Sequence, residues 1–93
     1  ILLIIDNGSY GSTGDQTTYA GMRTSLADVA RACGCDHVVE CAAEDTAAAV
    51  KAALAAEQTT VIVSKCESGN IKVPVIELDP VMIKERFMAS VAE

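Results

Sequence analysis

The chain has 93 residues, a formal net charge of −6 and an apolar fraction of 51%, with two tyrosines, one phenylalanine and no tryptophan. This length and composition predict one small domain with an aliphatic, alanine-rich core. The acidic balance argues against nucleic acid or an anionic membrane as a partner, because the sequence contains no basic stripe. The longest apolar run is too short to span a bilayer and follows no basic segment, so we expect a cytoplasmic protein.

The chain begins with five aliphatic residues, 1–5, followed by the polar, glycine-rich segment 6–16. The unbroken aliphatic run predicts a central parallel strand that is buried on both faces. Three glycines in the polar segment allow cramped backbone conformations and the close approach of a ligand. Because open α/β sheets bind their ligands beyond the carboxyl ends of the strands, we expect the functional site in segment 6–16. We therefore expect residues 1–93 to form one domain. Because the chain starts inside such a strand, we also expect this domain to be the C-terminal fragment of a larger domain.

The next segments predict a polar connection and a capped helix. Residues 15–23 show no regular period. Thr24 or Ser25 then provides an N-cap, and Asp28 completes a capping-box pattern after Ser25. Gly34 ends the helix as a C-terminal cap. One apolar face of this helix contains Leu26, Val29, Ala30 and Cys33.

The second half of the chain alternates strands and helices. Strands are predicted over 36–41 and 59–64, and a short edge strand over 73–78, where Pro74 cannot donate to a central ladder. A helix over 44–57 should bury Val50, Ala53 and Leu54, and Asp79-Pro80 starts a final helix that carries Met82, Ile83, Phe87 and Val91. The order of the elements predicts an α/β fold, a three-layer α/β/α sandwich with a mainly parallel sheet.

The four cysteines and the single histidine give no recognisable catalytic pattern. Cys33-Gly34-Cys35, Cys41 and Cys66 lack the C-x-x-C spacing that is typical of zinc or cluster sites, so we interpret them as small buried hydrophobes in a reducing cytosol. His37 has no neighbouring nucleophile in a known motif. It is therefore interpreted as a turn or strand-edge residue rather than a general base.

Segment 6–16 reads Asp-Asn-Gly-Ser-Tyr-Gly-Ser-Thr-Gly-Asp-Gln, and it resembles the second half of the diphosphate-binding motif of thiamine diphosphate enzymes. In that family a Gly-Asp-Gly and a later Asn at the end of a strand hold Mg²⁺ on the diphosphate of the cofactor. The likeness is strongest to the sulfopyruvate and phosphonopyruvate decarboxylases, in the subunit (beta) that carries the diphosphate-binding domain. It includes segment 24–34 and extends over essentially the whole chain, but the Gly-Asp-Gly half is absent here.

The resemblance implies a cofactor site of five residues, namely Asn7, Gly8, Ser9, Tyr10 and Gly11. Asn7 would bind the metal through its side-chain oxygen and Ser9 through its main-chain carbonyl, which suits Mg²⁺ because this ion takes oxygen ligands in octahedral geometry. Tyr10 and Gly11 would line the diphosphate pocket. The residues nearer the substrate side would be Thr13, Asp15 and Gln16.

The resemblance further implies the non-oxidative decarboxylation of a small 2-oxo acid, with thiamine diphosphate and Mg²⁺ as cofactors and a role in coenzyme M biosynthesis. No residue of this chain is assigned as catalytic, because the glutamate that activates the cofactor comes from a pyrimidine-binding (alpha) subunit or domain in such enzymes. We therefore expect an oligomer and an inactive isolated chain. The anionic group of the substrate would need a cation, for which Arg23 and Lys65 are the candidates near loops.

Two other interpretations remain open at this point. The loop is also similar to that of the beta subunit of 2-oxo acid:ferredoxin oxidoreductases, which usually reads Thr-Gly-Gly-Gln where this chain has Thr13-Gly14-Asp15-Gln16. The third interpretation is a truncated, non-catalytic α/β module that binds a partner or nothing.

Overall fold

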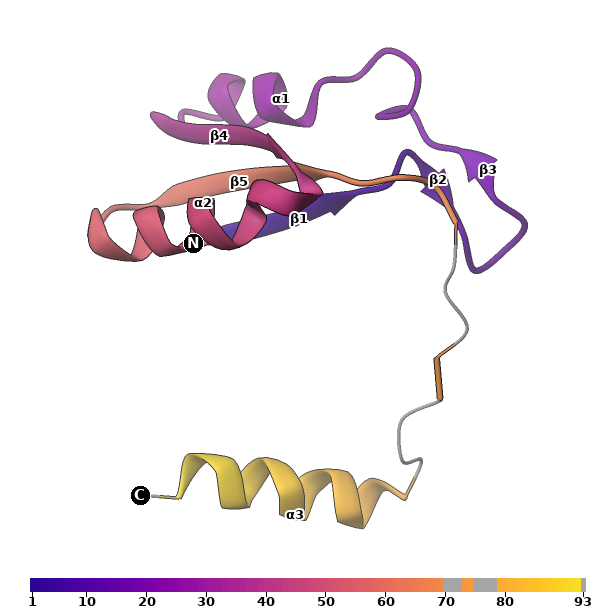
Figure 1. Ribbon diagram of the computed structural model, residues 1–93, viewed down its shortest axis with the longest axis vertical. Helices are drawn as coiled ribbons and strands as arrows, with labels where there is room; N and C mark the ends of the chain where they lie inside the picture. The colour runs from indigo at the N-terminus through magenta and orange to yellow at the C-terminus, as the bar shows by residue number, and fades with distance from the viewer. Residues whose placement is uncertain (70–72, 75–78, 93) are drawn as a thin grey trace.

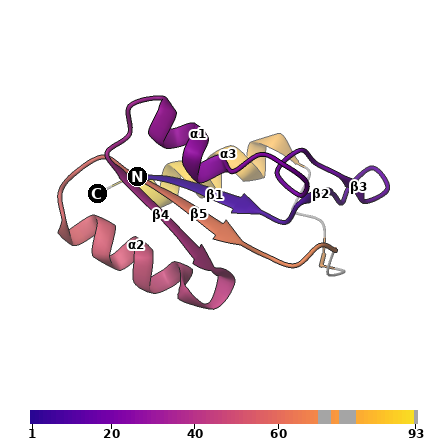
Figure 2. The same ribbon diagram turned by 90° about the horizontal axis from the view of Figure 1, so that it is seen from above.

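The computed structural model describes residues 1–69, 73–74 and 79–92. A parallel sheet has the strand order β1-β5-β4, formed by β1 (Leu2–Asp6), β5 (Thr60–Lys65) and β4 (His37–Ala42). Helices α1 (Leu26–Ala32) and α2 (Thr46–Ala55) cover its two faces, as Figures 1 and 2 show. The prediction of an α/β fold with helices on both faces of a mainly parallel sheet is confirmed.

The central strand is β5, and it forms most of the core. Its first five residues are all buried, and Ile62 and Val63 are completely inaccessible to solvent. Val61 and Val63 pack with Ala27 on the α1 face. Because side chains alternate along a strand, Thr60, Ile62 and Ser64 point toward the α2 face. The β-branched sequence of β5 is suited to this position between two helices.

The prediction that the first strand is central and buried on both faces is wrong. β1 lies at an edge of the sheet, paired in parallel with β5 from Leu2↔Val61 to Asp6↔Lys65. Its side chains are largely exposed, with Ile5 at 60%. Among the described residues only β5 pairs with β1, and the side chains of Leu2, Leu3 and Ile5 remain exposed in this edge position.

Helix α1 begins and ends as its caps predict. Ser25 is the N-cap, and its Oγ accepts a hydrogen bond from the amide of Asp28 at 3.1 Å. Gly34 has a φ of +89° after the helix, a left-handed conformation that glycine adopts without a Cβ clash. The inward face was predicted only in part. Leu26, Ala27 and Ala30 pack inward, whereas Val29 and Cys33 are exposed.

Helix α2 is shorter than the predicted range of 44–57. A 3₁₀ turn, Ala43–Asp45, precedes it, and the helix itself ends at Ala55. Ala53 is buried and Val50 partly so, as predicted. Leu54 is 67% exposed, so its predicted burial is wrong. The Oγ1 of Thr46 lies 2.6 Å from the Oγ of Ser64, and this contact ties the start of the helix to the central strand.

The segment after β1 contains a small antiparallel ribbon that the sequence analysis treated as an irregular connection. β2 (Ser9–Tyr10) pairs with β3 (Gln16–Thr17), with Ser9 opposite Thr17 and Tyr10 opposite Gln16. The turn between them is closed by the amides of Thr13 and Asp15, which both donate to the carbonyl oxygen of Tyr10 at 3.1 Å. The ribbon therefore makes the glycine-rich segment an ordered unit.

Helix α3 (Pro80–Val91) confirms the predicted start at Asp79-Pro80. Asp79 is the N-cap, and its Oδ1 accepts from the amide of Val81 at 2.9 Å. In Figure 1 the helix lies apart from the sheet, and each of its residues is exposed, including Phe87 at 64%. Val73 and Pro74 are not in a strand, and the rest of the edge strand predicted over 73–78 lies outside the described residues. No helix in the described ranges has both the length and the apolar character that crossing a membrane requires.

Candidate functional site

The carboxyl end of β1 carries the first residues of the predicted site. Asp6 is the last residue of the strand, and Asn7 and Gly8 form the turn into β2. Gly8 has a φ of +67°, in the left-handed region that glycine tolerates best. The turn places Asn7 and Ser9 on the wall of a cleft of about 390 Å³, which opens beyond the end of the strand. This is the edge of the sheet where a parallel α/β fold binds its ligands.

The side chain of Asn7 is held beside Ser9. Its Oδ1 accepts a hydrogen bond from the amide of Ser9 at 3.2 Å, which closes an Asx turn. Asn7 and Ser9 are both only partly buried. An amide oxygen has two acceptor positions, so one remains for a ligand after this bond. The sequence places two neutral oxygen donors here, and the turn brings their residues to one wall of the cleft.

A buried carboxylate anchors this turn to the central strand. Asp6 is 7% exposed, its Oδ1 accepts from the amide of Gly8 at 3.0 Å, and its Oδ2 accepts from Nζ of Lys65 at 2.6 Å. The main chain adds a further tie, since the amide of Cys66 donates to the carbonyl oxygen of Asp6 at 2.9 Å. The hydrogen bond from Lys65 is the main reason that the pKa of Asp6 is lowered, while burial opposes it. The same bond raises the pKa of Lys65.

A second set of contacts joins the ribbon to the loop after β5. The hydroxyls of Ser9 and Ser68 both donate to Oδ1 of Asp15, at 2.5 and 2.7 Å, and the Oγ of Ser68 lies 3.1 Å from that of Ser9. These two hydrogen bonds lower the pKa of Asp15, and the bond from Ser9 has the larger effect. Asp15 therefore contacts a predicted metal-binding residue, a role that the sequence pattern did not indicate.

Gly21 packs directly on the turn. A Cβ atom at Gly21 would lie 2.6 Å from the carbonyl oxygen of Gly8, which is closer than real Cβ contacts allow. The amide of Thr18 also donates to this oxygen at 2.9 Å. The two glycines approach each other so closely that the turn and segment 18–24 form one surface, which the sequence analysis did not foresee.

The cleft contains several residues that sequence reasoning missed. Of the five predicted cofactor residues, Asn7, Ser9 and Tyr10 line the cleft, whereas Gly8 and Gly11 are not among its lining residues. The additional lining residues come from β1, segment 18–24 and the start of α1, and they are Ile5, Asp6, Thr18, Tyr19, Ala20, Thr24 and Leu26. A glycine packed on the Asp-Asn-Gly turn cannot be recognised from spacing alone, because it acts by having no side chain.

The donor set of the cleft fits a metal ion that is carried on a diphosphate. Within the described ranges, no group of three histidine, cysteine or acidic side chains is placed to hold a metal by itself. Asn7 and Ser9 offer neutral oxygens, and Mg²⁺ is commonly held by a few protein oxygens plus phosphate oxygens. Asp6, the acidic side chain of the cleft wall, is paired with Lys65. An anionic group can therefore enter without meeting an unpaired buried carboxylate.

Three of the residues predicted to lie near the substrate, Thr13, Gln16 and Lys65, bind other groups of the chain instead. Thr13 Oγ1 donates to Oε1 of Gln16 at 3.2 Å, and Nε2 of Gln16 returns a bond to the carbonyl of Thr13 at 3.1 Å, so both side chains stabilise the turn of the ribbon. Lys65 is engaged by Asp6. Arg23 is exposed and lies in segment 18–24, where its amide donates to the carbonyl of Tyr19.

None of the four cysteines forms a disulfide bond, and their exposure to solvent differs. Cys33 is exposed, so its predicted burial is wrong, while Cys35, Cys41 and Cys66 are partly buried. Cys66 lies near Ser64, with its Sγ 3.7 Å from the serine Oγ. The structure places them at separate points of the sheet and its connections, consistent with small apolar side chains.

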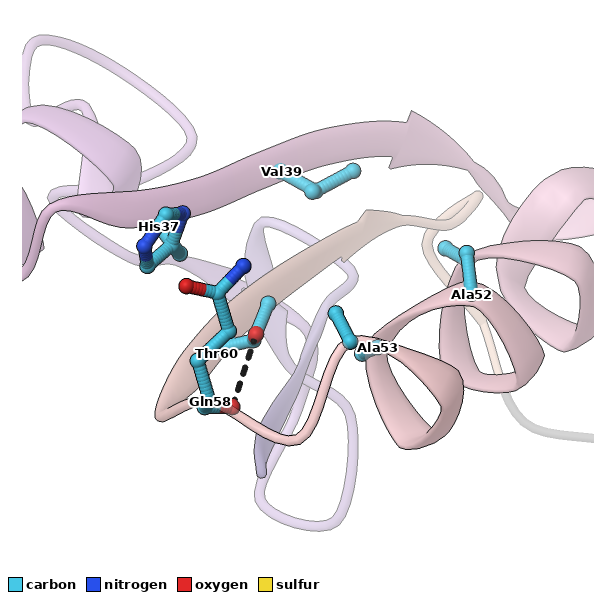
Figure 3. Close-up of a pocket in the computed structure, with 8 residues that line it drawn as sticks. His37, Val39, Ala52, Ala53, Gln58 and Thr60 are labelled. Carbon is cyan, nitrogen blue, oxygen red and sulfur yellow. Dashed lines mark hydrogen bonds between the residues drawn. The ribbon is translucent and has the colours of Figure 1, made fainter.

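A second hollow, of about 260 Å³, lies at the opposite end of the strands (Figure 3). It is formed between α2 and the first residues of β4 and β5, where His37 and Thr60 stand opposite each other in register. Thr60 Oγ1 donates to the carbonyl of Gln58 at 3.2 Å, and Ala49, Ala52, Ala53 and Ala56 complete the wall. His37 is the first residue of β4, one position after the predicted start of the strand, and it is at the strand end as its interpretation as a turn or strand-edge residue requires. This hollow is remote from the Asn7 turn.

The sequence of this chain is similar to those of known proteins. Residues 1–64 match the family model described as thiamine pyrophosphate enzyme, C-terminal TPP binding domain. The chain is 42% identical over 91 residues to the sulfopyruvate decarboxylase subunit beta of Methanocaldococcus jannaschii, covering 98% of this chain and 48% of the relative. It is 45% identical over 91 residues to the protein of the same name from Methanococcus maripaludis, covering 98% and 49%.

The chain thus spans about half the length of the curated relatives it matches. No solved structure matches it. The family match includes the whole of β1, the Asn7 turn, the ribbon, α1, β4, α2 and all of β5 except its last residue. On the strength of that match, which covers the cleft and the sheet that supports it, the chain belongs to the thiamine pyrophosphate (thiamine diphosphate) enzymes, as a member of their C-terminal TPP-binding domain family.

Proposed function

We propose that this chain forms the diphosphate-binding side of a thiamine diphosphate-dependent decarboxylase that converts sulfopyruvate to sulfoacetaldehyde and carbon dioxide. The observation that carries the proposal is the Asn7 turn, which brings an amide oxygen and Ser9 to one wall of a cleft at the carboxyl end of β1. The names of two relatives that are 42% and 45% identical support the choice of substrate.

In this proposal Asn7 binds Mg²⁺ through its side-chain oxygen and Ser9 binds it through its main-chain carbonyl. Both ligands are neutral, so the charge of the ion is balanced by the diphosphate and by a carboxylate from outside this chain. Gly8 supplies the bend that lets two residues of one turn serve the same ion. Tyr10, which lies in the lining of the cleft, and Gly11, which follows it in the chain, would face the diphosphate.

Thiamine diphosphate supplies, when bound, an electron sink for the pair of electrons that carbon dioxide leaves behind on a 2-oxo acid. The contribution of this chain is to hold and orient the diphosphate end, since none of its residues is assigned a proton-transfer role. A pyrimidine-binding (alpha) subunit completes the site in an oligomer. The word "beta" in the names of both relatives supports such a partner. The unbridged cysteines favour a reducing compartment such as the cytoplasm.

The test is an assay of the natural full-length protein together with its pyrimidine-binding subunit. We expect release of carbon dioxide from sulfopyruvate that depends on both thiamine diphosphate and Mg²⁺, and no need for an electron acceptor. Faster turnover of phosphonopyruvate would assign the related substrate instead. Product formation only in the presence of oxidised ferredoxin would support the oxidoreductase interpretation, and failure of the protein to bind the cofactor would overturn the proposal.

A further inference from the structure

Lys65 was a candidate cation for the anionic group of the substrate, but the structure gives its ammonium group another partner. Its Nζ lies 2.6 Å from Oδ2 of Asp6, a side chain that is only 5% exposed. Asp6 and Lys65 are also direct neighbours in the β1–β5 ladder. A lysine that is held beside a buried carboxylate neutralises the charge of that carboxylate, so its ammonium group is already engaged and is not free for an anionic substrate group.

The carboxylate carries this contact on to the cofactor turn. The Oδ2 of Asp6 is bound by Lys65, while its Oδ1 accepts from the amide of Gly8 at 3.0 Å. Gly8 is the residue with a φ of +67° that separates Asn7 from Ser9. The path from Lys65 to the predicted metal-binding residues therefore consists of one ion pair and one hydrogen bond, both within a few residues of the end of β1.

The charge of Asp6 matters as well as its position. Asp6 lines the cleft that an anionic diphosphate would enter. With Lys65 in place the pair is neutral, whereas without it a buried carboxylate would repel the diphosphate at short range, where solvent screening is weak. Asp6 is the buried member of the pair, since the Lys65 side chain is 42% exposed. Removing the lysine alone would leave this buried carboxylate uncompensated, so it should be more harmful than removing both charges.

We propose that Lys65 is a positioning residue, which acts through Asp6 to fix the Asn7 turn and to neutralise the wall of the diphosphate cleft, and that it does not bind the substrate. This inference rests on the proposed function, since it concerns the same cleft. It assigns a role to a side chain that lies 58 positions along the chain from Asn7 but is paired in the β1–β5 ladder with Asp6, the residue before Asn7.

Four variants of the natural full-length protein separate the two roles of the lysine. Lys65→Met removes the charge, Lys65→Arg keeps it, and the double variant Asp6→Asn with Lys65→Met leaves a neutral pair that can still accept from the Gly8 amide. Lys51→Met on α2 is the matched control, because it removes a lysine remote from the cleft. The readouts are calorimetric affinity for thiamine diphosphate with Mg²⁺, the KM for sulfopyruvate at saturating cofactor, and amide hydrogen exchange at Gly8.

We expect Lys65→Met to weaken cofactor binding by about 10- to 100-fold, in the range seen when residues behind a metal ligand are changed. Lys65→Arg and the double variant should recover most of this loss, and the KM for sulfopyruvate should stay within about twofold of the wild type, since a positioning residue makes no substrate contact. The Gly8 amide should exchange faster in Lys65→Met than in Lys51→Met.

A different pattern would overturn the inference. If Lys65 binds the substrate directly, Lys65→Met would raise the KM about tenfold or more and leave the cofactor affinity unchanged, and the double variant would be no better. Unchanged exchange at Gly8 would likewise contradict a role in fixing the turn. Hydrogen exchange needs no cofactor, so it tests the inference even if the wild-type protein proves not to bind thiamine diphosphate, a result that would instead remove the proposed function.

Discussion

Gly21 lies so close to Gly8 that a Cβ atom on Gly21 would stand 2.6 Å from the Gly8 carbonyl oxygen and 3.2 Å from its Cα. The contact is with main-chain atoms, which cannot rotate away as a flexible side chain would. Segment 18–24 is thereby packed on the turn that carries Asn7. Any side chain at position 21 must displace the turn or the segment.

This contact predicts the effect of Gly21→Ala. The extra methyl group should cost about 1–3 kcal/mol of stability, the range for overpacking at a tightly filled position. It should also weaken thiamine diphosphate binding, because the Asn7 turn is displaced. Urea denaturation and calorimetric titration measure the two effects.

Gly34→Ala provides the matched control. Gly34 has a φ of +89°, and apart from its chain neighbours no atom of the described residues lies within 4 Å of its Cβ position. Alanine there should therefore cost about 1–2 kcal/mol through backbone strain alone. Cofactor affinity should be unaffected, because Gly34 lies at the end of α1. Equal loss of affinity in both variants would show that general destabilisation, and not the Gly8–Gly21 contact, governs binding.

The Asp6–Lys65 pair predicts how stability depends on pH. The pKa of Asp6 is lowered from its usual 3.8, mainly by Lys65, so its contribution is fully present above about pH 4 and is lost as the pH falls through the folded-state value. The pKa of Lys65 is raised from 10.5, mainly by Asp6 and slightly by Glu40, so its contribution is fully present below that value and is lost at higher pH.

Thermal unfolding should therefore be measured from about pH 2 to pH 12. The contribution of this pair to the free energy of unfolding should be constant between about pH 4 and pH 10 and should fall outside that range. Asp6→Asn should lower the free energy of unfolding within that range by about 1 kcal/mol, which is less than is typical for a hydrogen bond to a charged group because the Lys65 side chain is 42% exposed and solvent screens the pair. It should also reduce the losses at both ends. A variant profile that runs parallel to the wild type at every pH would contradict this account of the pair.

The conformation of Asp15 gives a prediction for the ribbon. Asp15 has a φ of 60°, which is uncommon for a residue with a Cβ, and its carboxylate holds the hydroxyls of Ser9 and Ser68. Asp15→Gly and Asp15→Ala both remove these bonds, but only alanine keeps the backbone strain. We expect Asp15→Ala to be less stable than Asp15→Gly by about 1 kcal/mol, measured by urea denaturation. Equal stability would mean that the backbone at this position is not left-handed in solution.

Two aliphatic residues test which surfaces of the fold are covered. Ile62 is completely buried, so Ile62→Ala should cost about 2–5 kcal/mol, the usual range for a large core deletion. Leu54 is 67% exposed, and Leu54→Ala should change stability by less than about 0.5 kcal/mol. Both are measured by chemical denaturation. A loss of more than about 2 kcal/mol in Leu54→Ala would place this side chain in an interface.

The sequence predicted the fold well where local chemistry determines the structure. The N-caps Ser25 and Asp79 and the C-terminal glycine Gly34 act in the chain as their types indicate. The strands β4 and β5 begin within one residue of their predicted starts. These features depend on a few neighbouring residues and need no knowledge of distant contacts.

Predictions that depended on the neighbours of an element were less successful. The aliphatic run of β1 has the composition of a central strand, but its position in the sheet depends on which strands pair with it. Leu54 fits an apolar helical pattern, yet the residue that α2 buries is Ala53, and Leu54 is exposed. Hydrophobic periodicity identifies a face, but it cannot say what lies opposite.

The site was predicted in the same uneven way. The motif predicted a cofactor site at Asn7, Gly8 and Ser9; the structure places Asn7 and Ser9 at the cleft beyond β1, and their binding role stays a prediction. The sequence could not show that Lys65, a candidate substrate cation, pairs instead with Asp6 across the sheet, or that Gly21 packs on the turn through its lack of a side chain. Long-range pairing and close packing become visible only in three dimensions.

The most direct test is the calorimetric affinity of the full-length protein for thiamine diphosphate, with Mg²⁺ and with the metal chelated, in the wild type, Asn7→Ala and Ser12→Ala. Ser12 lies in the same ribbon and makes no side-chain hydrogen bond within the described ranges, so it is the matched control. We predict binding that requires Mg²⁺, a loss of about 10- to 100-fold in Asn7→Ala and no change in Ser12→Ala. Equal affinity of Asn7→Ala and the wild type would contradict the assignment of this turn as the metal and diphosphate site.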